Sequence, residues 1–207
     1  MLIFADKGLT VLATPKTGST ALEMALRPKA DIIFAKQRKH ITAQRYRSKI
    51  APFLAKTFGI ETETCAVMRA PVDQLRSWYR YRARDGIADP ARSTRHLTFD
   101  AFIAAVISDA PPEYARVGSQ FTFLTGGTGE VLVDHLFGYD QSDLLLAFLS
   151  KRLGSAVAPK RRNVSPRKEA PLSDEMNKQL RAARAEEFAL YDRLAAAGGY
   201  LARGGSG

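Results

Sequence analysis

Residues 11–26, VLATPKTGSTALEMAL, pass from an apolar run through a short polar loop into a helical pattern. The loop contains a proline, a lysine and a single glycine, Gly18, and Pro28 ends the helical pattern that follows. Between them, apolar residues recur at the spacing of one helix face: Ala21, Leu22, Ala25 and Leu26. A strand that runs directly into a helix is the repeating unit of α/β sheets. This segment therefore predicts a strand–loop–helix unit near the start of an α/β fold.

The rest of the chain alternates between the same two kinds of pattern. We expect further strands over residues 2–5, 31–35, 64–69 and 130–137. We expect further helices over residues 42–59, 71–84, 98–108, 142–154 and 173–198. Asp6 and Gly8, between the first two strands, suit a tight turn, which predicts an N-terminal hairpin. The expected fold class is α/β, with a P-loop-like, central, mostly parallel sheet flanked by helices.

Length and composition limit the domain count and the kinds of partner. The 207 residues predict one domain spanning 1–207, and the glycine-rich residues 198–207 predict a frayed tail. Lys and Arg number 31 against 21 Asp and Glu, a net charge of +10 that favours anionic partners. The single cysteine, Cys65, excludes an intrachain disulfide and a multi-cysteine metal site. The chain has neither a signal-peptide pattern nor an apolar run of membrane-spanning length, so we expect a cytoplasmic protein without a transmembrane segment.

The loop Pro15–Thr20 has the features of an anion-binding site at the start of a helix. The backbone N–H groups of its last four residues would face outward at the positive end of the helix dipole. Gly18 would let an anion approach the backbone, and the Ser19 hydroxyl adds a donor. Lys16 adds a mobile positive charge. The plain alternative is a helix N-terminus that its own Ser and Thr residues cap.

The position of the lysine separates this loop from that of ATP-binding P-loop proteins. Their motif, G-x-x-x-x-G-K-[ST], places the lysine after the second glycine and a Ser or Thr next to it, which holds Mg²⁺. Here Lys16 precedes the only glycine of the loop, Gly18, and no glycine lies upstream in register. A nucleotide or small-molecule kinase stays an alternative that the motif disfavours.

A second stretch, VMRAPVDQLRSWYRYR at residues 67–82, places Arg69 at the end of a nearly continuous apolar run. A charge at the end of a buried strand is costly unless it meets an opposite charge. Ser77 follows on the next helix, which Pro71 opens. Arg69 is therefore a second candidate for binding an anion.

The two stretches together resemble the PAPS-dependent sulfotransferase family. The first signature of that family, P-K-[TS]-[GA]-[ST]-[ST] between a strand and a helix, matches Pro15, Lys16, Thr17, Gly18, Ser19 and Thr20. The second, R-x-P-x-x-x-x-x-S-x-Y, matches Arg69, Pro71, Ser77 and Tyr79. The resemblance extends to Tyr139-Asp140 and to the segment NVSPR at 163–167. The chain looks most similar to the compact, carbohydrate-acting, Golgi-type branch as found in bacteria.

The resemblance implies an enzyme that moves the sulfuryl group of 3′-phosphoadenosine-5′-phosphosulfate (PAPS) to an acceptor hydroxyl by in-line displacement, with PAP as product and no metal. The acceptor would be a carbohydrate or a glycolipid, and no nucleic-acid partner is implied. The first loop would hold the 5′-phosphosulfate with Lys16 at the bridging oxygen, and Arg69 and Ser77 would bind the 3′-phosphate. A late basic loop, Pro159–Lys168, would close over the nucleotide, with these candidate contacts: Arg161, Arg162, Ser165 and Arg167.

His40, in the segment RKHITAQ between the two loops, is the candidate catalytic base. Histidine suits proton removal at neutral pH, and the family commonly places a catalytic histidine in this interval. The alternative is a surface or helix-capping histidine in a basic run. His96 has no recognisable motif, and His135 is expected to be a strand residue that faces a neighbour.

A non-enzyme alternative comes from the aromatic residues of the helix predicted over 71–84. Trp78, Tyr79 and Tyr81 share this helix with several arginines, a pattern that could stack nucleic-acid bases. The same spacing fits a helix that packs its aromatic face into the core, which is the interpretation we favour.

Overall fold

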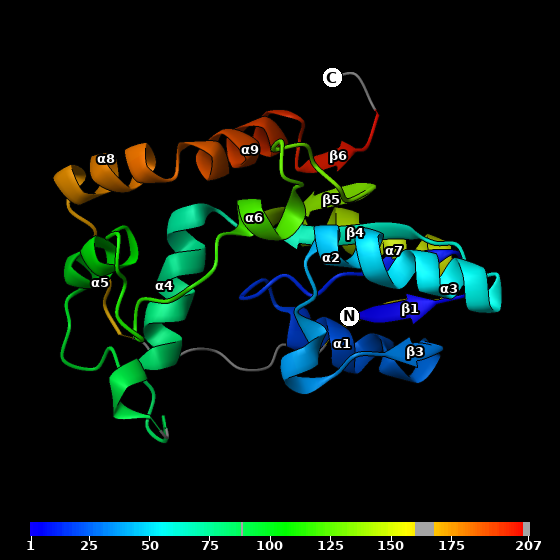
Figure 1. Ribbon diagram of the computed structural model, residues 1–207, viewed down its shortest axis with the longest axis horizontal. Helices are drawn as coiled ribbons and strands as arrows, with labels where there is room; N and C mark the ends of the chain where they lie inside the picture. The colour runs from blue at the N-terminus through cyan, green and yellow to red at the C-terminus, as the bar shows by residue number, and fades with distance from the viewer. Residues whose placement is uncertain (88, 160–167, 205–207) are drawn as a thin grey trace.

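The computed structural model describes residues 1–87, 89–159 and 168–204. In this part of the chain an open six-stranded sheet is flanked by helices, which confirms the predicted α/β class (Figure 1). The strands are β1 (Leu2–Phe4), β2 (Leu9–Val11), β3 (Ile32–Ile33), β4 (Glu63–Met68), β5 (His135–Gly138) and β6 (Tyr200–Ala202). The α-helices are α1 (Ser19–Leu26), α2 (Ala43–Arg45), α3 (Ala51–Phe58), α4 (Pro71–Arg82), α5 (Phe99–Val106), α6 (Gln120–Leu124), α7 (Ser142–Leu153), α8 (Asp174–Ala183) and α9 (Ala185–Ala196). Shorter turns are η1 (Arg27–Lys29), η2 (Lys36–Lys39), the π-helical η3 (Tyr46–Ile50), η4 (Pro90–Arg92) and η5 (Tyr139–Gln141).

The sheet has the strand order β3-β1-β2-β4-β5-β6 and is mixed. β2, β4 and β5 are parallel, whereas β1 pairs antiparallel with β2 and β3, and β6 pairs antiparallel with β5. The prediction of a mostly parallel sheet is therefore wrong outside the three central strands. Residues 5–8 alone join β1 to β2. So short a connection allows only antiparallel pairing, because a parallel crossover needs about a dozen residues or more.

The predicted frayed tail is a second difference. Tyr200–Ala202 form β6, in register with His135 to Phe137 of β5. The Tyr200 hydroxyl is hydrogen-bonded to His135 Nδ1 at 2.8 Å, and the Tyr200 ring packs on Phe137 with 4.9 Å between ring centroids. These contacts join parts of the chain that are far apart in sequence. They hold residues 200–202 in the sheet, where a local glycine-rich pattern alone predicts fraying.

The two faces of the sheet belong to different apolar clusters, because successive residues of a strand point to opposite faces. In β4, Cys65 and Val67 pack with residues of α1 and α7, while Ala66 and Met68 pack with residues of α3, α6 and α9. A third cluster, around Tyr79, joins α4, α5 and α8 at one end of the molecule (Figure 1). Cys65 is fully buried in the centre of the sheet, and this burial raises its pKa to about 12.

The helix boundaries differ from the predicted ones in the longest segments. The segment predicted over 42–59 contains α2, η3 and α3 in succession. The segment predicted over 173–198 is divided at Arg184 into α8 and α9, and Arg184 Nη1 donates to the buried Glu187 carboxylate at 3.2 Å. α6 has no counterpart among the predicted helices. Within the described residues, no helix combines the length and the apolar character that crossing a bilayer requires.

Candidate functional site

The loop after β2 enters α1 with an uncommon backbone conformation. Lys16 and Gly18 both have a positive φ, of 66° and 74°, and Gly18 is the N-cap residue of α1. A Cβ at position 18 would be strained and would lie 3.5 Å from the Tyr139 ring. Within the described residues, no side chain caps the first turn of α1. The Ala21 N–H donates to the Gly18 carbonyl at 3.0 Å, whereas the N–H groups of Ser19 and Thr20 have no partner within the described residues and remain available to an anion. The self-capped alternative therefore does not describe this helix start.

The two ends of the loop are tied to neighbouring elements. The buried Thr17 hydroxyl donates to the Thr14 carbonyl at 2.8 Å. The Pro15 carbonyl accepts a hydrogen bond from Gln74 Nε2 of α4 at 3.4 Å. Thr20, in the first turn of α1, accepts from Lys39 Nζ at 2.9 Å. The loop is thus connected to α4 on one side and to η2 on the other.

The side chain of Lys16 lies against aromatic rings of α4. Its ammonium nitrogen is 3.9 Å from the centroid of the Tyr81 ring and 5.0 Å from that of Trp78. Burial lowers the pKa of Lys16 to about 7, and the neighbouring positive charges of Arg84 and Arg69 act in the same direction. Lys16 therefore changes its charge state near neutral pH when no anion is bound.

Arg69 follows β4 and is held next to the loop through its own backbone. Gln120 Oε1 accepts from the Arg69 N–H, and Gln120 Nε2 donates to the Arg69 carbonyl, each at 2.9 Å. The guanidinium lies 4.6 Å from the centroid of the Tyr139 ring and donates to the Lys16 carbonyl at 3.5 Å. Among the residues that the structure describes, no carboxylate pairs with Arg69. Its charge is available to a bound anion.

Ser77 lies on α4, on the side that faces the loop. Its helical neighbours at i−3 and i+4 are Gln74 and Tyr81. Gln74 contacts Pro15 and Tyr81 contacts Lys16. The structure therefore turns Ser77 and Arg69 toward the same loop from two different elements.

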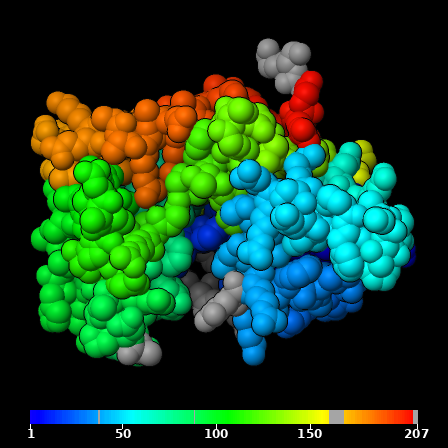
Figure 2. All heavy atoms as spheres, in the orientation of Figure 1, coloured from blue at the N-terminus to red at the C-terminus, as the bar shows by residue number. Residues whose placement is uncertain are grey.

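Three buried polar atoms around the loop have no hydrogen-bond partner within the described residues: Thr14 Oγ1, Gln74 Oε1 and Trp78 Nε1. Thr14 precedes the loop, while Gln74 and Trp78 contact Pro15 and Lys16. Buried polar groups are rarely left unpaired, and a group of them at one place indicates a polar ligand or ordered water. In Figure 2 the molecular surface is hollowed between the part that carries α1 to α3 and the part that carries α4 and α5.

His40 is hydrogen-bonded to the backbone of Ala13, which lies two positions before Pro15. Its Nδ1 lies 2.6 Å from the Ala13 carbonyl oxygen, which can only accept, so Nδ1 carries the proton. Nε2 is then the unprotonated nitrogen on an exposed side chain. Desolvation of the ring and the charge of Lys39 outweigh the hydrogen bond to Ala13 and hold the pKa of His40 below 6.5. The ring is neutral at neutral pH, the state that a general base requires.

The other predicted site residues have different outcomes. Arg161, Arg162, Ser165 and Arg167 lie outside the described residues. The chain that follows them is fixed to α4, because Arg80 Nε donates to the Lys168 carbonyl at 2.9 Å and Arg76 Nε donates to the Ala170 carbonyl at 3.2 Å. His96 is exposed. His135 contacts Tyr200 and Glu63 at the amino end of the parallel strands, as expected of a strand residue that faces a neighbour.

Sequence reasoning missed two contributions to this site, one from Gln120 and one from the aromatic residues of α4. Gln120 positions Arg69, yet a lone glutamine in a segment without a motif carries no recognisable signal. The aromatic face of α4 does not pack as a unit in the core: Tyr79 is buried, but Tyr81 is 38% exposed and contacts Lys16 together with Trp78. Trp78 and Tyr81 lie at i and i+3 on one helix, and this spacing is the one signal that could have suggested their shared contact with Lys16.

Gln120→Leu should lower the free energy of unfolding by roughly 2–3 kcal/mol, because it leaves the N–H and carbonyl groups of Arg69 without partners. Chemical denaturation monitored by circular dichroism measures this change. The matched control is Gln179→Leu, which removes an exposed hydrogen bond to Glu175 and should change stability by less than about 0.5 kcal/mol. Equal effects of the two substitutions would contradict the positioning role of Gln120.

Two further findings concern metal ligands and similarity to known proteins. Among the described residues, no three His, Cys, Asp or Glu side chains come together as a metal ion would require. No protein-family model, curated protein or solved structure matches the chain.

Proposed function

We propose that this chain is an enzyme of the PAPS-dependent sulfotransferase family that transfers a sulfuryl group to an acceptor hydroxyl of a carbohydrate or glycolipid. A P-loop-like arrangement of the central strands and a cytoplasmic location belong to the same proposal. The observation that carries it is the meeting of two anion-binding elements. The helix start after β2 has no side-chain cap, and Arg69 after β4 pairs with no carboxylate of the described residues. The two lie next to each other, because Arg69 donates a hydrogen bond to the Lys16 carbonyl.

The residues fit the chemistry of PAPS, which carries anionic groups at its 5′ and 3′ positions. The first-turn amides of α1, with Ser19 and Thr20, suit the 5′-phosphosulfate. Arg69 and Ser77 suit the 3′-phosphate, since guanidinium and hydroxyl groups are strong donors to phosphate. The three unpaired polar atoms around Pro15 and Lys16 support a polar ligand at this place. Arg161, Arg162, Ser165 and Arg167 are proposed as further contacts from the late basic loop.

PAPS supplies an activated sulfuryl group when it is bound. The role of Lys16 is to place a positive charge where negative charge grows on the leaving oxygen. Lys16 must be protonated for this role, and an adjacent phosphate anion raises the pKa of an ammonium group from its ligand-free value of about 7. The role of His40 is to accept the proton of the acceptor hydroxyl at Nε2, while its Nδ1–H stays bonded to Ala13.

The other two functions fit these observations less well. A kinase would need a lysine after the glycine and a side chain that holds Mg²⁺. Here Lys16 precedes Gly18 in the loop, and its side chain packs against Tyr81 of α4. A nucleic-acid module would stack bases on the exposed aromatic residues of α4. In the structure Trp78 and Tyr81 already have cations of this chain over their rings, those of Lys16, Arg82 and Arg84.

PAP should bind at least about tenfold more tightly than ADP, because the two have the same number of phosphates and only PAP has one at the 3′ position. Isothermal titration calorimetry of the full chain with PAP, ADP and AMP measures this preference. Arg69→Met should abolish it. Arg116→Met, whose side chain is 64% exposed, is the control and should leave it unchanged. Equal affinities of the unaltered protein for PAP and ADP would overturn the proposal.

A further inference from the structure

One face of the segment formed by α2, η3 and α3 combines exposed cations with exposed aromatic rings. We call it the basic aromatic surface and define it by five exposed residues: Arg45, Lys49, Phe53, Lys56 and Phe58. The opposite face of the same segment is buried in the core through Ala43, Tyr46 and Leu54. The segment therefore differs from an ordinary amphipathic surface helix, because large apolar groups lie on its exposed side as well as on its buried side.

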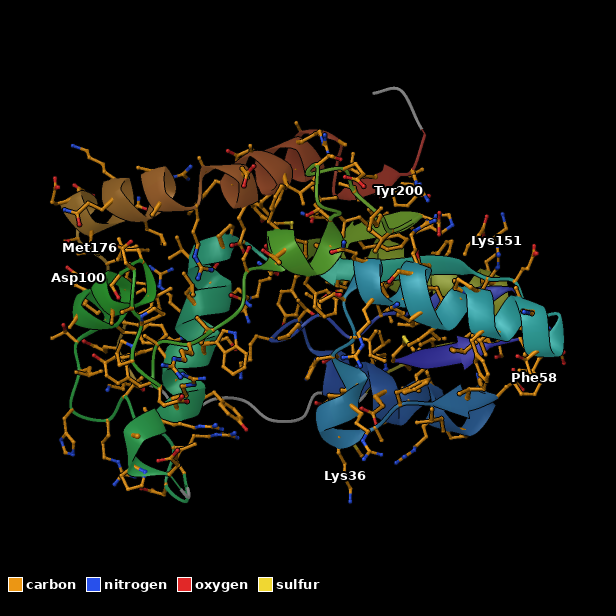
Figure 3. All side chains as sticks on the ribbon, in the orientation of Figure 1. Lys36, Phe58, Asp100, Lys151, Met176 and Tyr200 are labelled. Atoms are coloured by element: carbon orange, nitrogen blue, oxygen red, sulfur yellow. The ribbon has the colours of Figure 1, made fainter. Side chains whose placement is uncertain are left out.

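The two phenylalanine side chains of this surface are unusually exposed to solvent. Phe53 is 56% exposed and Phe58 is 60% exposed, and their rings meet edge to face with 5.7 Å between centroids. Figure 3 places Phe58 at the free end of α3, at the edge of the molecule remote from Asp100 and Met176. Exposed apolar groups that gather in one place, bordered by charges, commonly mark an interaction site.

The three cations of this surface form no ion pair within the described residues. Lys49 and Lys56 lie at i−4 and i+3 from Phe53, and Arg45 lies one further turn toward the N-terminus. No Asp or Glu occurs anywhere from residue 32 to residue 60. Arg45, Lys49 and Lys56 therefore have no acidic residue within four positions along the chain, and the first acidic residue after them is Glu61. The partner that complements such a surface carries negative charge next to apolar material.

We propose that the basic aromatic surface docks onto an anionic lipid bilayer, with Phe53 and Phe58 at the boundary between headgroups and acyl chains and with Lys49 and Lys56 at the lipid phosphates. Lysine or arginine beside exposed phenylalanine on one helix face is the pattern of interfacial membrane binding. A second copy of this chain is a poorer partner, because a two-fold contact would bring like charges together. Single-stranded nucleic acid is also a poorer partner, since rings that meet edge to face offer no parallel stacking platform. The inference does not depend on the proposed enzymatic activity.

Flotation of the full chain with vesicles tests this inference. The protein should float with phosphatidylcholine vesicles that contain about a quarter phosphatidylserine, and not with pure phosphatidylcholine vesicles. The Lys49→Glu/Lys56→Glu variant should lower the partition coefficient by at least about 25-fold, since each charge removed near such a surface costs roughly fivefold. Phe53→Ser/Phe58→Ser should lower it by at least about tenfold, because two apolar rings are lost from the interface.

The matched controls come from α7, where Leu144 is 44% exposed and Lys151 is exposed. Leu144→Ser and Lys151→Glu change the same kinds of residue at a different place and should leave partitioning within twofold. Thermal melts verify that all variants are folded. Absence of binding to anionic vesicles, or equal losses in the control variants, would overturn the inference. So would a loss of single-stranded DNA binding, or of self-association in sedimentation, in the phenylalanine variant while vesicle binding is unchanged.

Discussion

Lys16→Ala should lower the turnover of PAPS by about 10²–10³-fold, the loss typical of removing one group that stabilises charge in a transition state. The affinity for PAP, measured by calorimetry, should change by less than about fivefold, because the first-turn amides of α1 and Arg69 stay in place. A radiolabelled PAPS assay over a panel of hydroxyl acceptors measures the rate. This result would separate Lys16 from residues that only bind the nucleotide.

The chain offers a matched control for this substitution. Among the lysines that the structure describes, Lys36 is the other one with a positive φ, at 54°, and it is exposed. Lys36→Ala therefore repeats the backbone consequence of placing alanine at positive φ without touching the loop. If Lys36→Ala lost as much activity as Lys16→Ala, strain and not charge would explain the loss. Normal rates in Lys16→Ala would remove Lys16 from the mechanism.

The pH dependence gives a second readout of Lys16. With a pKa of about 7 in the ligand-free protein, the active protonated form predominates below pH 7 and is lost as pH rises through 7. Accordingly, kcat/KM for PAPS, which reports on the free enzyme, should fall above about pH 7. Lys16→Arg should move this decline well above pH 7, because a guanidinium keeps its proton throughout that range.

His40→Gln should lower turnover by about 10²–10⁴-fold, the usual contribution of a general base. Glutamine can still donate a hydrogen bond to the Ala13 carbonyl, as His40 Nδ1 does, but has no nitrogen that accepts a proton. The substitution thus removes the base and retains the link to the loop. The rate assay with radiolabelled PAPS measures the loss, and PAP affinity should stay within about twofold.

The acid limb of the pH profile distinguishes a base from a structural histidine. In the proposed mechanism the neutral form of His40 is the active one, and its pKa lies below 6.5. Activity should therefore fall only as pH drops below 6.5, and this limb should be absent from the residual activity of His40→Gln. His96→Gln, at an exposed position, is the control and should retain both the rate and the limb. An unchanged acid limb in His40→Gln would refute the assignment.

Local patterns were sufficient for the features of the fold that depend on neighbouring residues. The apolar run before Arg69 predicts β4, and Pro71 together with the spacing that follows predicts α4, because both depend on nearest neighbours in the chain. The pairing of the last strand, β6, is different in kind. β6 exists because Tyr200 meets His135 and Phe137, a contact between residues more than sixty positions apart. No local pattern contains that contact.

The candidate site divides in the same way. Gly18 and the following hydroxyl residues indicate an anion site because a helix start is a local structure. The direction of the Lys16 side chain depends on where α4 packs, and the position of Arg69 depends on Gln120 from a helix absent from the predicted set. Sequence reasoning therefore selected residues that lie together at this loop, but not the residues that orient them.

Cys65, the one cysteine of the chain, lies in the central strand of the sheet and is fully buried. A thiol reagent has access to it only in molecules in which the covering residues of α1 and α7 have moved away from this face of the sheet. Thiol modification under native conditions thus records how often this layer opens, without any group added to the protein. A nucleotide that binds only the closed form lowers this opening frequency by the factor 1 + [L]/Kd. The buried thiol makes ligand affinity measurable through the rate of a single covalent reaction, even when no acceptor is known.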